Sequence, residues 1–179
     1  MVSALLALLL AAAPPDRPTL TVAGDRVLVA LPPSILKQKE VRARLESALT
    51  TTFIVKTKDS NARIEIRYDL WDEVYRVKRV DAAGRVAQQQ IANAAQLEAW
   101  WRTPVEIARL AGDRAALDLE LVVLPFSAAD ESDARQWLSK SGGTRDPSID
   151  SKSVVDALIG TTLSARPIVS YRWSLEARR

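Results

Sequence analysis

The chain contains neither cysteine nor histidine. The lack of cysteine excludes disulfide bonds, thiolate nucleophiles, thiolate zinc clusters and lipid attachment through an N-terminal cysteine. The lack of histidine removes the side chain most often used as a general base and as a metal ligand. We therefore expect no cofactor and no transition-metal site. Any catalysis would have to use carboxylates or a serine–lysine pair.

The chain also lacks a strong charge of either sign. It has 25 Lys and Arg residues against 22 Asp and Glu residues, which gives a net charge of +3. These cations are spread along the sequence, whereas a nucleic-acid-binding protein gathers them in a patch or stripe. We expect no nucleic acid as a partner. With 179 residues, 47% of them hydrophobic, the chain is long enough for one domain with a proper core.

Long hydrophobic runs are scarce, and the main one spans residues 4–13. It is too short to cross a bilayer comfortably and ends in small residues before Pro14, as in a signal peptide. Ala11 and Ala13 predict cleavage after residue 13, although no Lys or Arg precedes the run. We expect a signal peptide over residues 1–13, a single β-rich domain over 14–179 with no transmembrane segment, and a periplasmic or secreted location.

Residues 62–80 carry the clearest pattern in the chain. Apolar and charged residues alternate with a period of two, which predicts a strand with one buried and one solvated face. A second strand follows a break at residues 70–73, where we expect Trp71 to anchor a corner. The charged face predicts cross-strand ion pairs in water, and a ligand-binding charged sheet is the alternative. The first strand's expected buried residues are Ile64, Ile66, Tyr68 and Leu70, and its expected exposed residues are Arg63, Glu65, Arg67 and Asp69.

Shorter patterns predict the remaining elements. Asp130 is expected to cap a helix that ends before Gly142, and a helix with Val41, Leu45, Ala48 and Leu49 on one face is expected after Ser34. Residues 92–102 predict another helix and 154–159 a helical turn. Together the elements predict a mainly β, α+β domain with an antiparallel, sandwich-like sheet and peripheral helices. The other expected strands span residues 19–23, 26–31, 50–58, 85–91, 105–110, 115–126 and 168–175.

Several short motifs follow one another in an order that resembles a family of secreted bacterial proteins known as a domain of unknown function. The sequence departs from the family's pattern at residues 41–50 and 127–166. The resemblance implies a periplasmic domain, sometimes encoded beside a membrane sensor histidine kinase, with no established activity and hence no catalytic residue to transfer. The motifs are Leu31-Pro32, Tyr68-Asp69-Leu70 with Tyr75-Arg76-Val77, Leu97 in its helix, Leu124-Pro125, and Tyr171-Arg172-Trp173.

Some polar residues could carry chemistry, but each has a structural interpretation that we favour. Asp72 and Glu73 could form a catalytic pair, yet neighbours in a strand point to opposite faces and a turn explains them better. Residues 139–144 lack the ending of a phosphate-binding loop, and Ser139 and Lys140 do not face each other on a helix. Three further carboxylates could bind Ca²⁺ but fit the first turn of a helix: Asp130, Glu131 and Asp133.

Three tryptophans form the candidate binding surface: Trp100, Trp101 and Trp137. Neighbouring helical residues differ by about 100°, so one of Trp100 and Trp101 is expected to point inward and the other to be exposed. Our leading hypothesis is a non-enzymatic periplasmic domain that binds a protein partner, such as the outer face of a membrane complex. The alternatives are a carrier whose tryptophans line a cleft for an apolar ligand, and a hydrolase.

Overall fold

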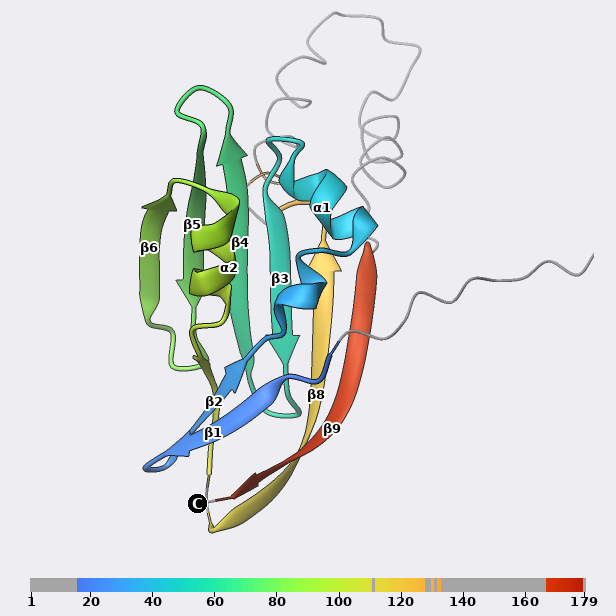
Figure 1. Ribbon diagram of the computed structural model, residues 1–179. Helices are drawn as coiled ribbons and strands as arrows, with labels where there is room; N and C mark the ends of the chain where they lie inside the picture. Colours follow the sequence, from blue (N-terminus) through green and yellow to red (C-terminus); the bar gives the residue numbers. More distant parts are fainter. Residues whose placement is uncertain (1–15, 111, 128–129, 131, 133–166, 179) are drawn as a thin grey trace, which may run out of the picture.

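The protein folds into two antiparallel β-sheets and a few short helices. The computed structural model describes residues 16–110, 112–127, 130, 132 and 167–178, and Figure 1 shows its elements. One sheet has three strands in the order β1-β2-β7, and the other has six in the order β6-β5-β4-β3-β8-β9. This arrangement confirms the predicted α+β, sandwich-like fold. The strands are β1 (Thr19–Ala23), β2 (Arg26–Ala30), β3 (Thr51–Lys56), β4 (Asn61–Asp69), β5 (Val74–Val80), β6 (Val86–Ile91), β7 (Val105–Arg109), β8 (Arg114–Leu124) and β9 (Val169–Arg178).

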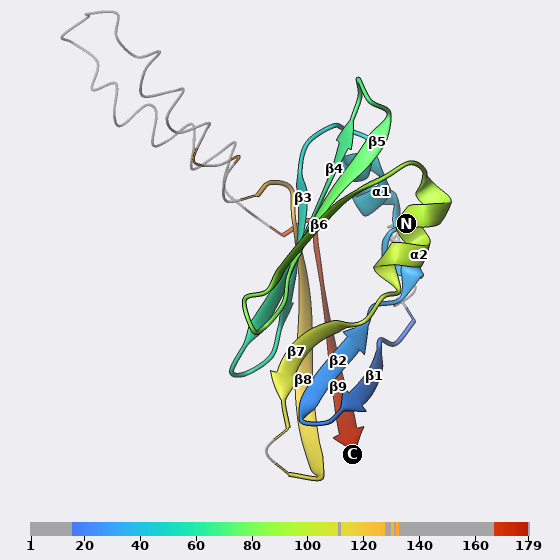
Figure 2. The same ribbon diagram turned by 90° about the vertical axis from the view of Figure 1, so that its left-hand side faces the viewer.

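The helices and the small sheet lie on the same face of the six-stranded sheet. Figure 2 views the large sheet from its β6 edge, with α1, α2 and the β1-β2-β7 sheet all on one side. The helices are η1 (Pro33–Ile35), α1 (Lys39–Leu45) and α2 (Ala94–Trp101). No described helix is long and apolar enough to cross a bilayer. The described core therefore lies between the large sheet and this second layer.

The central hairpin follows its predicted register. In β4, Ile64 and Ile66 are buried against the second layer, while Arg67 is exposed on the other face. Ile66 pairs with Val77 of β5 and with Thr51 of β3, so it lies near the middle of the sheet. The period-two pattern therefore assigned Ile64 and Ile66 to the buried face correctly. Its prediction of a buried Leu70 is wrong, because β4 ends at Asp69 and Leu70, in the following turn, is 62% exposed.

The predicted helix after Ser34 is shorter than expected and begins later. A 3-10 turn occupies Pro33–Ile35, and α1 runs only from Lys39 to Leu45. Val41 and Leu45 are buried as predicted. Ala48 has a φ of 59°, in the left-handed region that ends a right-handed helix, so it and Leu49 fall outside the helix. The signal-peptide segment, the helix expected after Asp130 and the turn at 154–159 fall wholly or largely outside the described residues.

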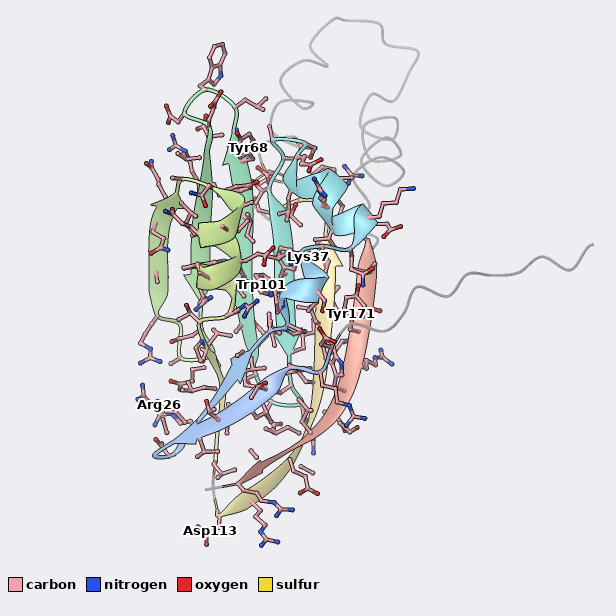
Figure 3. The ribbon with its side chains drawn as sticks, in the orientation of Figure 1. Arg26, Lys37, Tyr68, Trp101, Asp113 and Tyr171 are labelled. Atoms are coloured by element: carbon pink, nitrogen blue, oxygen red, sulfur yellow. The ribbon has the colours of Figure 1, made fainter. Side chains whose placement is uncertain are left out.

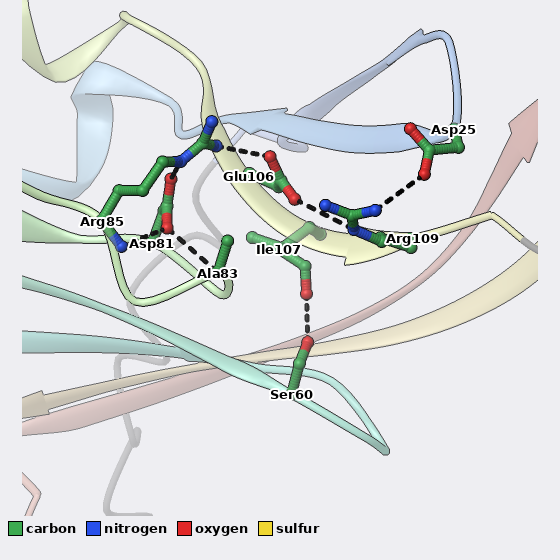
Figure 4. Close-up of polar contacts among 8 residues, drawn as sticks. All are labelled: Asp25, Ser60, Asp81, Ala83, Arg85, Glu106, Ile107 and Arg109. Atoms are coloured by element: carbon green, nitrogen blue, oxygen red, sulfur yellow. Dashed lines mark hydrogen bonds and ion pairs between the residues drawn. The ribbon is translucent and has the colours of Figure 1, made fainter.

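Polar contacts join β7 of the small sheet to the turns of the large one (Figure 4). The N–H of Ala82 donates to the Glu106 carbonyl at 3.0 Å, and the Ser60 hydroxyl donates to the Ile107 carbonyl. Arg85 also binds the Glu106 carboxylate. These contacts fix the small sheet on the large one near the β3–β4 and β5–β6 turns.

Candidate functional site

Of the two described tryptophans that were predicted to form a binding surface, one is buried in the core and the other is half-buried. Trp101 is only 1% exposed, and its ring packs edge-on against Phe53 with centroids 4.7 Å apart. Its Nε1 donates to the Pro32 carbonyl at 3.1 Å, so Trp101 fastens α2 to the interior (Figure 3). Trp101 is thus the member of the pair that points inward, as the helical spacing predicted, because Leu97 and Trp101 lie one turn apart on the buried face of α2. Its assignment to the binding surface is wrong. Trp137 lies outside the described residues.

Trp100 is half-buried and already has a partner. The Arg79 guanidinium lies over its ring, 4.4 Å from the centroid, and Arg79 Nη2 donates to the Trp100 carbonyl at 3.3 Å. Burial lowers the pKa of Arg79. Arg79 therefore occupies one face of the indole through a cation–π contact, and Trp100 is not a free binding platform.

Of the four large apolar residues that are exposed in the described part of the chain, Val86 begins β6 and the other three lie near the end of the central hairpin. Trp71 is 96% exposed, Leu70 62% and Leu49 44%. Leu70 and Trp71 form the β4–β5 turn, and Leu49 precedes the β3 strand that pairs with β4, at the same end of the sheet. Figures 1 and 2 show that this hairpin end extends past α1 and α2. We call Leu49, Tyr68, Leu70, Trp71 and Tyr75 the tip patch.

The sequence prediction of Trp71 as a corner anchor is therefore wrong. One feature of the sequence could have indicated that Trp71 is exposed: the pair Leu70-Trp71 lies inside a four-residue turn between two strands. A turn at the end of a two-stranded projection has no second layer to pack against, so large apolar side chains there stay in water. A fully exposed tryptophan is an informative observation, because large aromatic rings are on average mostly buried.

Hydrogen bonds hold the turn that carries Trp71 in one shape. Asp69 Oδ1 accepts from the N–H of Trp71 at 3.0 Å and of Asp72 at 3.3 Å. Arg76 then binds both carboxylates: Nε donates to Asp69 at 2.9 Å and Nη2 to Asp72 at 2.8 Å. The hydrogen bonds from the Trp71 and Asp72 N–H groups, with Arg76, lower the pKa of Asp69. Trp71 is thus presented from a pre-formed turn.

Backbone strain marks the same end of the sheet. Among the described non-glycine residues, Ala48 (φ 59°) and Glu73 (φ 53°) are the ones with a positive φ. Ala48 precedes Leu49, and Glu73 closes the turn after Trp71. A left-handed conformation costs a residue with a Cβ about 1–2 kcal/mol. Residues held in such conformations often surround functional sites, where the strain fixes a required geometry.

The tip patch continues into a cleft between the two helices. Tyr68 and Tyr75 face each other across the hairpin with ring centroids 4.9 Å apart, and burial is the main factor that raises the pKa of Tyr75. Tyr75 also lines the cleft, which has a volume of about 510 Å³. Lys37, between η1 and α1, forms an ion pair with Glu98 of α2, with its Nζ 3.1 Å from the carboxylate. The other lining residues are both charged and apolar: Arg42, Glu46, Leu36, Leu45, Ala94 and Leu97.

The opposite face of the large sheet is polar. Glu65 of β4 lies 3.2 Å from Arg63 and 3.8 Å from Lys78, its cross-strand neighbour on β5. These contacts agree with the interpretation of the charges as ion pairs on a solvated face. A shallow groove of about 330 Å³ also lies there, between β4, β5 and β6. Its lining includes Arg67, Lys78 and Gln88, which makes it a polar hollow and not an apolar one.

The remaining polar candidates do not assemble into a reactive site within the described part of the chain. Asp130 accepts from the Ser127 N–H and hydroxyl at 2.9 and 2.8 Å, which caps a turn. Asp72 lies in the β4–β5 turn, where Arg76 binds it. Among the residues described, no group of three acidic side chains could hold a metal ion. Four predicted candidates lie outside these residues: Glu131, Asp133, Ser139 and Lys140.

Comparison of the chain with protein-family models, with curated proteins and with solved structures finds no match. The tip patch is therefore characterised by its own geometry. It combines exposed apolar side chains, a turn fixed by hydrogen bonds, local backbone strain and an adjoining cleft lined by both apolar and charged residues. Leu70 and Trp71 themselves lie outside the hydrophobic core.

Proposed function

We propose that this protein is a non-enzymatic, exported bacterial domain that binds a protein partner through its tip patch. The observation that carries the proposal is Trp71, which is 96% exposed on a turn that Asp69 and Arg76 hold in place. Tryptophan is enriched among the residues that dominate protein–protein binding energies. A backbone held in one shape before binding loses little conformational entropy when its side chain docks.

The free energy available from burying the Trp71 side chain supports Trp71 as the main binding residue. Burying an aromatic side chain removes about 150–250 Å² from water, which corresponds to about 4–6 kcal/mol before the costs of association. Three carboxylates lie in or next to this turn, those of Asp69, Asp72 and Glu73, against the one guanidinium of Arg76 that binds the first two. The partner we expect offers an apolar pocket with basic residues on its rim.

Site-specific crosslinking in the native cell tests this proposal. A photoreactive residue would replace Trp71 in one variant and Thr21, which is exposed on β1, in a control variant. We expect a discrete protein adduct from position 71 that is lost when Leu70→Ser is added, and none from position 21. Equal labelling from both positions, or none from 71, would contradict the proposal. N-terminal sequencing of the same material tests export, which predicts a chain that begins near Pro14.

The cleft favours a second candidate, a carrier of a small apolar ligand. Leu36, Leu45 and Leu97 line a volume of about 510 Å³, within the usual size range of small-molecule sites. Native mass spectrometry of protein purified from its own cell would show a bound small molecule if this function holds. Leu97→Trp should then abolish the bound mass and leave crosslinking from position 71 unchanged. The hydrolase alternative gains no support from Asp69 and Asp72, because Arg76 binds both carboxylates.

A further inference from the structure

The strand β6 is an open edge of the six-stranded sheet. It pairs with β5 on one side and with no other described strand. Five of its six residues are exposed, and Val86 is 57% exposed. Figure 2 looks straight at this edge and shows that α2 lies over one face of the sheet and does not cover the edge itself. The backbone groups of β6 that point away from β5 are therefore accessible to another strand.

This edge also lacks the devices that usually keep sheet edges apart. Natural edge strands carry lysines, prolines, bulges or a cover. In β6 the sequence is VAQQQI, with no charge and no proline, and its pairing with β5 is regular over all six residues. The chain has no charged residue from position 86 to position 97. In contrast, β9 at the other edge carries Arg172, Glu176 and Arg178.

The chemistry of the edge matches a copy of itself. A glutamine amide both donates and accepts hydrogen bonds, so Gln88 can pair with Gln88 of another molecule. A two-fold axis perpendicular to the sheet makes the two β6 strands antiparallel. The same face of each copy then lies on the same side of the joint sheet. Two residues that pair directly across the two β6 strands must then point their side chains to the same side of the joint sheet. Only a register centred on a residue, such as Gln88 or Gln89, satisfies this condition.

Nearby charges do not oppose such a pairing. Lys78 lies opposite Gln88 on β5, so the two copies of Lys78 would be three strand spacings apart, or about 14 Å. That separation exceeds the screening length of about 8 Å at physiological ionic strength. Arg85, at the start of β6, is already bound to Asp81 and Glu106.

We propose that two copies of this protein associate through β6, in antiparallel register centred on Gln88 or Gln89, to form one continuous sheet with six strands from each copy. The axis reverses the strand direction of one copy, so the two tip patches lie at opposite ends of the joint sheet. Neither is covered. The proposal is therefore independent of the function proposed for the tip patch, and each can fail alone.

The absence of native cysteine permits a direct test by disulfide crosslinking. Gln88→Cys and Gln89→Cys each place one thiol on the proposed axis, and Ser170→Cys places one on the exposed opposite edge of the same sheet. Under mild oxidation we expect a covalent dimer from Gln88→Cys or Gln89→Cys, and at least about tenfold less from Ser170→Cys. Similar crosslinking from all three, or from neither β6 variant, would overturn the proposal.

Sedimentation of the cysteine-free protein across the micromolar range gives a second readout. We expect a monomer–dimer equilibrium that Gln88→Lys weakens about tenfold or more in a register centred on Gln88, and Gln89→Lys in a register centred on Gln89, because like charges directly opposite each other in a sheet repel. The matched control, Ser170→Lys, should leave the equilibrium unchanged, and unchanged melting temperatures would show that the variants fold. A wild-type protein that stays monomeric at every concentration would overturn the proposal.

Discussion

Arg85 donates a hydrogen bond from Nη2 to the carboxylate of Glu106 at 2.5 Å, and so links the β5–β6 turn to β7 (Figure 4). The two partners differ in their access to water: the Glu106 side chain is 3% exposed and that of Arg85 is 57% exposed. Asp81 binds the Nε of the same arginine at 2.7 Å. The buried member of the pair is thus the anion, and Arg85 is the closest cation to it.

This asymmetry predicts unequal effects of removing either partner. Arg85→Met leaves a buried carboxylate with only the longer contact to Arg109, whose Nε lies 3.9 Å away, and should lower the free energy of unfolding by about 3 kcal/mol. Glu106→Gln leaves an arginine that water and Asp81 still satisfy, and should cost about 1–3 kcal/mol. Urea unfolding of the two variants checks the order. A larger loss for Glu106→Gln would contradict the burial argument.

A second prediction concerns the two faces of β4. Ile66 is fully buried, so Ile66→Ala removes packed atoms and should cost about 2–5 kcal/mol. Arg67 is exposed on the opposite face, and Arg67→Ala should cost less than about 1 kcal/mol. Chemical denaturation measures both changes. If the two losses were equal, the charged face of the sheet would also have to be covered in the folded protein.

These two strand faces could be predicted from sequence because the pattern is local. The alternation of apolar and charged residues along β4 determines which side chains are buried, and it does not depend on which elements pack on the sheet. The same holds for β8, where Leu119 and Leu121 alternate with Asp118 and Glu120 and are buried. The sandwich-like class followed from counting such strands. Sequence position alone did not give the strand order, in which β3 pairs with β8 across a long separation in the chain.

The candidate site could not be predicted in the same way. Whether Trp71 folds back or projects depends on what lies beside the hairpin end, and that is set by the lengths of β4 and α1 together. The burial of Trp101 depends on Phe53, a distant residue in the chain. A local pattern identified both tryptophans as notable, but it could not show which of them the tertiary structure would cover.

A third prediction uses the pH dependence of the tip. The Asp69 pKa is lowered by hydrogen bonds from the Trp71 and Asp72 N–H groups and by Arg76. The charged carboxylate therefore stabilises the turn fully above about pH 4, and this contribution disappears as the pH falls through the lowered pKa. In ¹H–¹⁵N NMR titrations, the Trp71 and Asp72 amide signals should move together with a midpoint below about 3.9. Asp69→Asn should abolish that transition, and its persistence would contradict the assignment.

The last prediction separates the stability of the tip from its geometry. Glu73 has a φ of 53°, a conformation that costs a residue with a Cβ about 1–2 kcal/mol and costs glycine almost nothing. Glu73→Gly removes this strain but gives the unfolded chain more freedom, so we expect a net gain in stability of about 0.5–1 kcal/mol. Thermal unfolding measures the gain.

Gly24 in the β1–β2 turn provides the reverse control for that strain. It has a φ of 68°, and an added Cβ would meet no atom within 4 Å, so Gly24→Ala introduces backbone strain without a steric clash. It should lose about 1–2 kcal/mol. The gain in Glu73→Gly should be accompanied by greater mobility of the Trp71 amide in NMR relaxation and by weaker crosslinking from the tip. A variant that is more stable and crosslinks equally well would mean that the strain at Glu73 does not serve the presentation of Trp71.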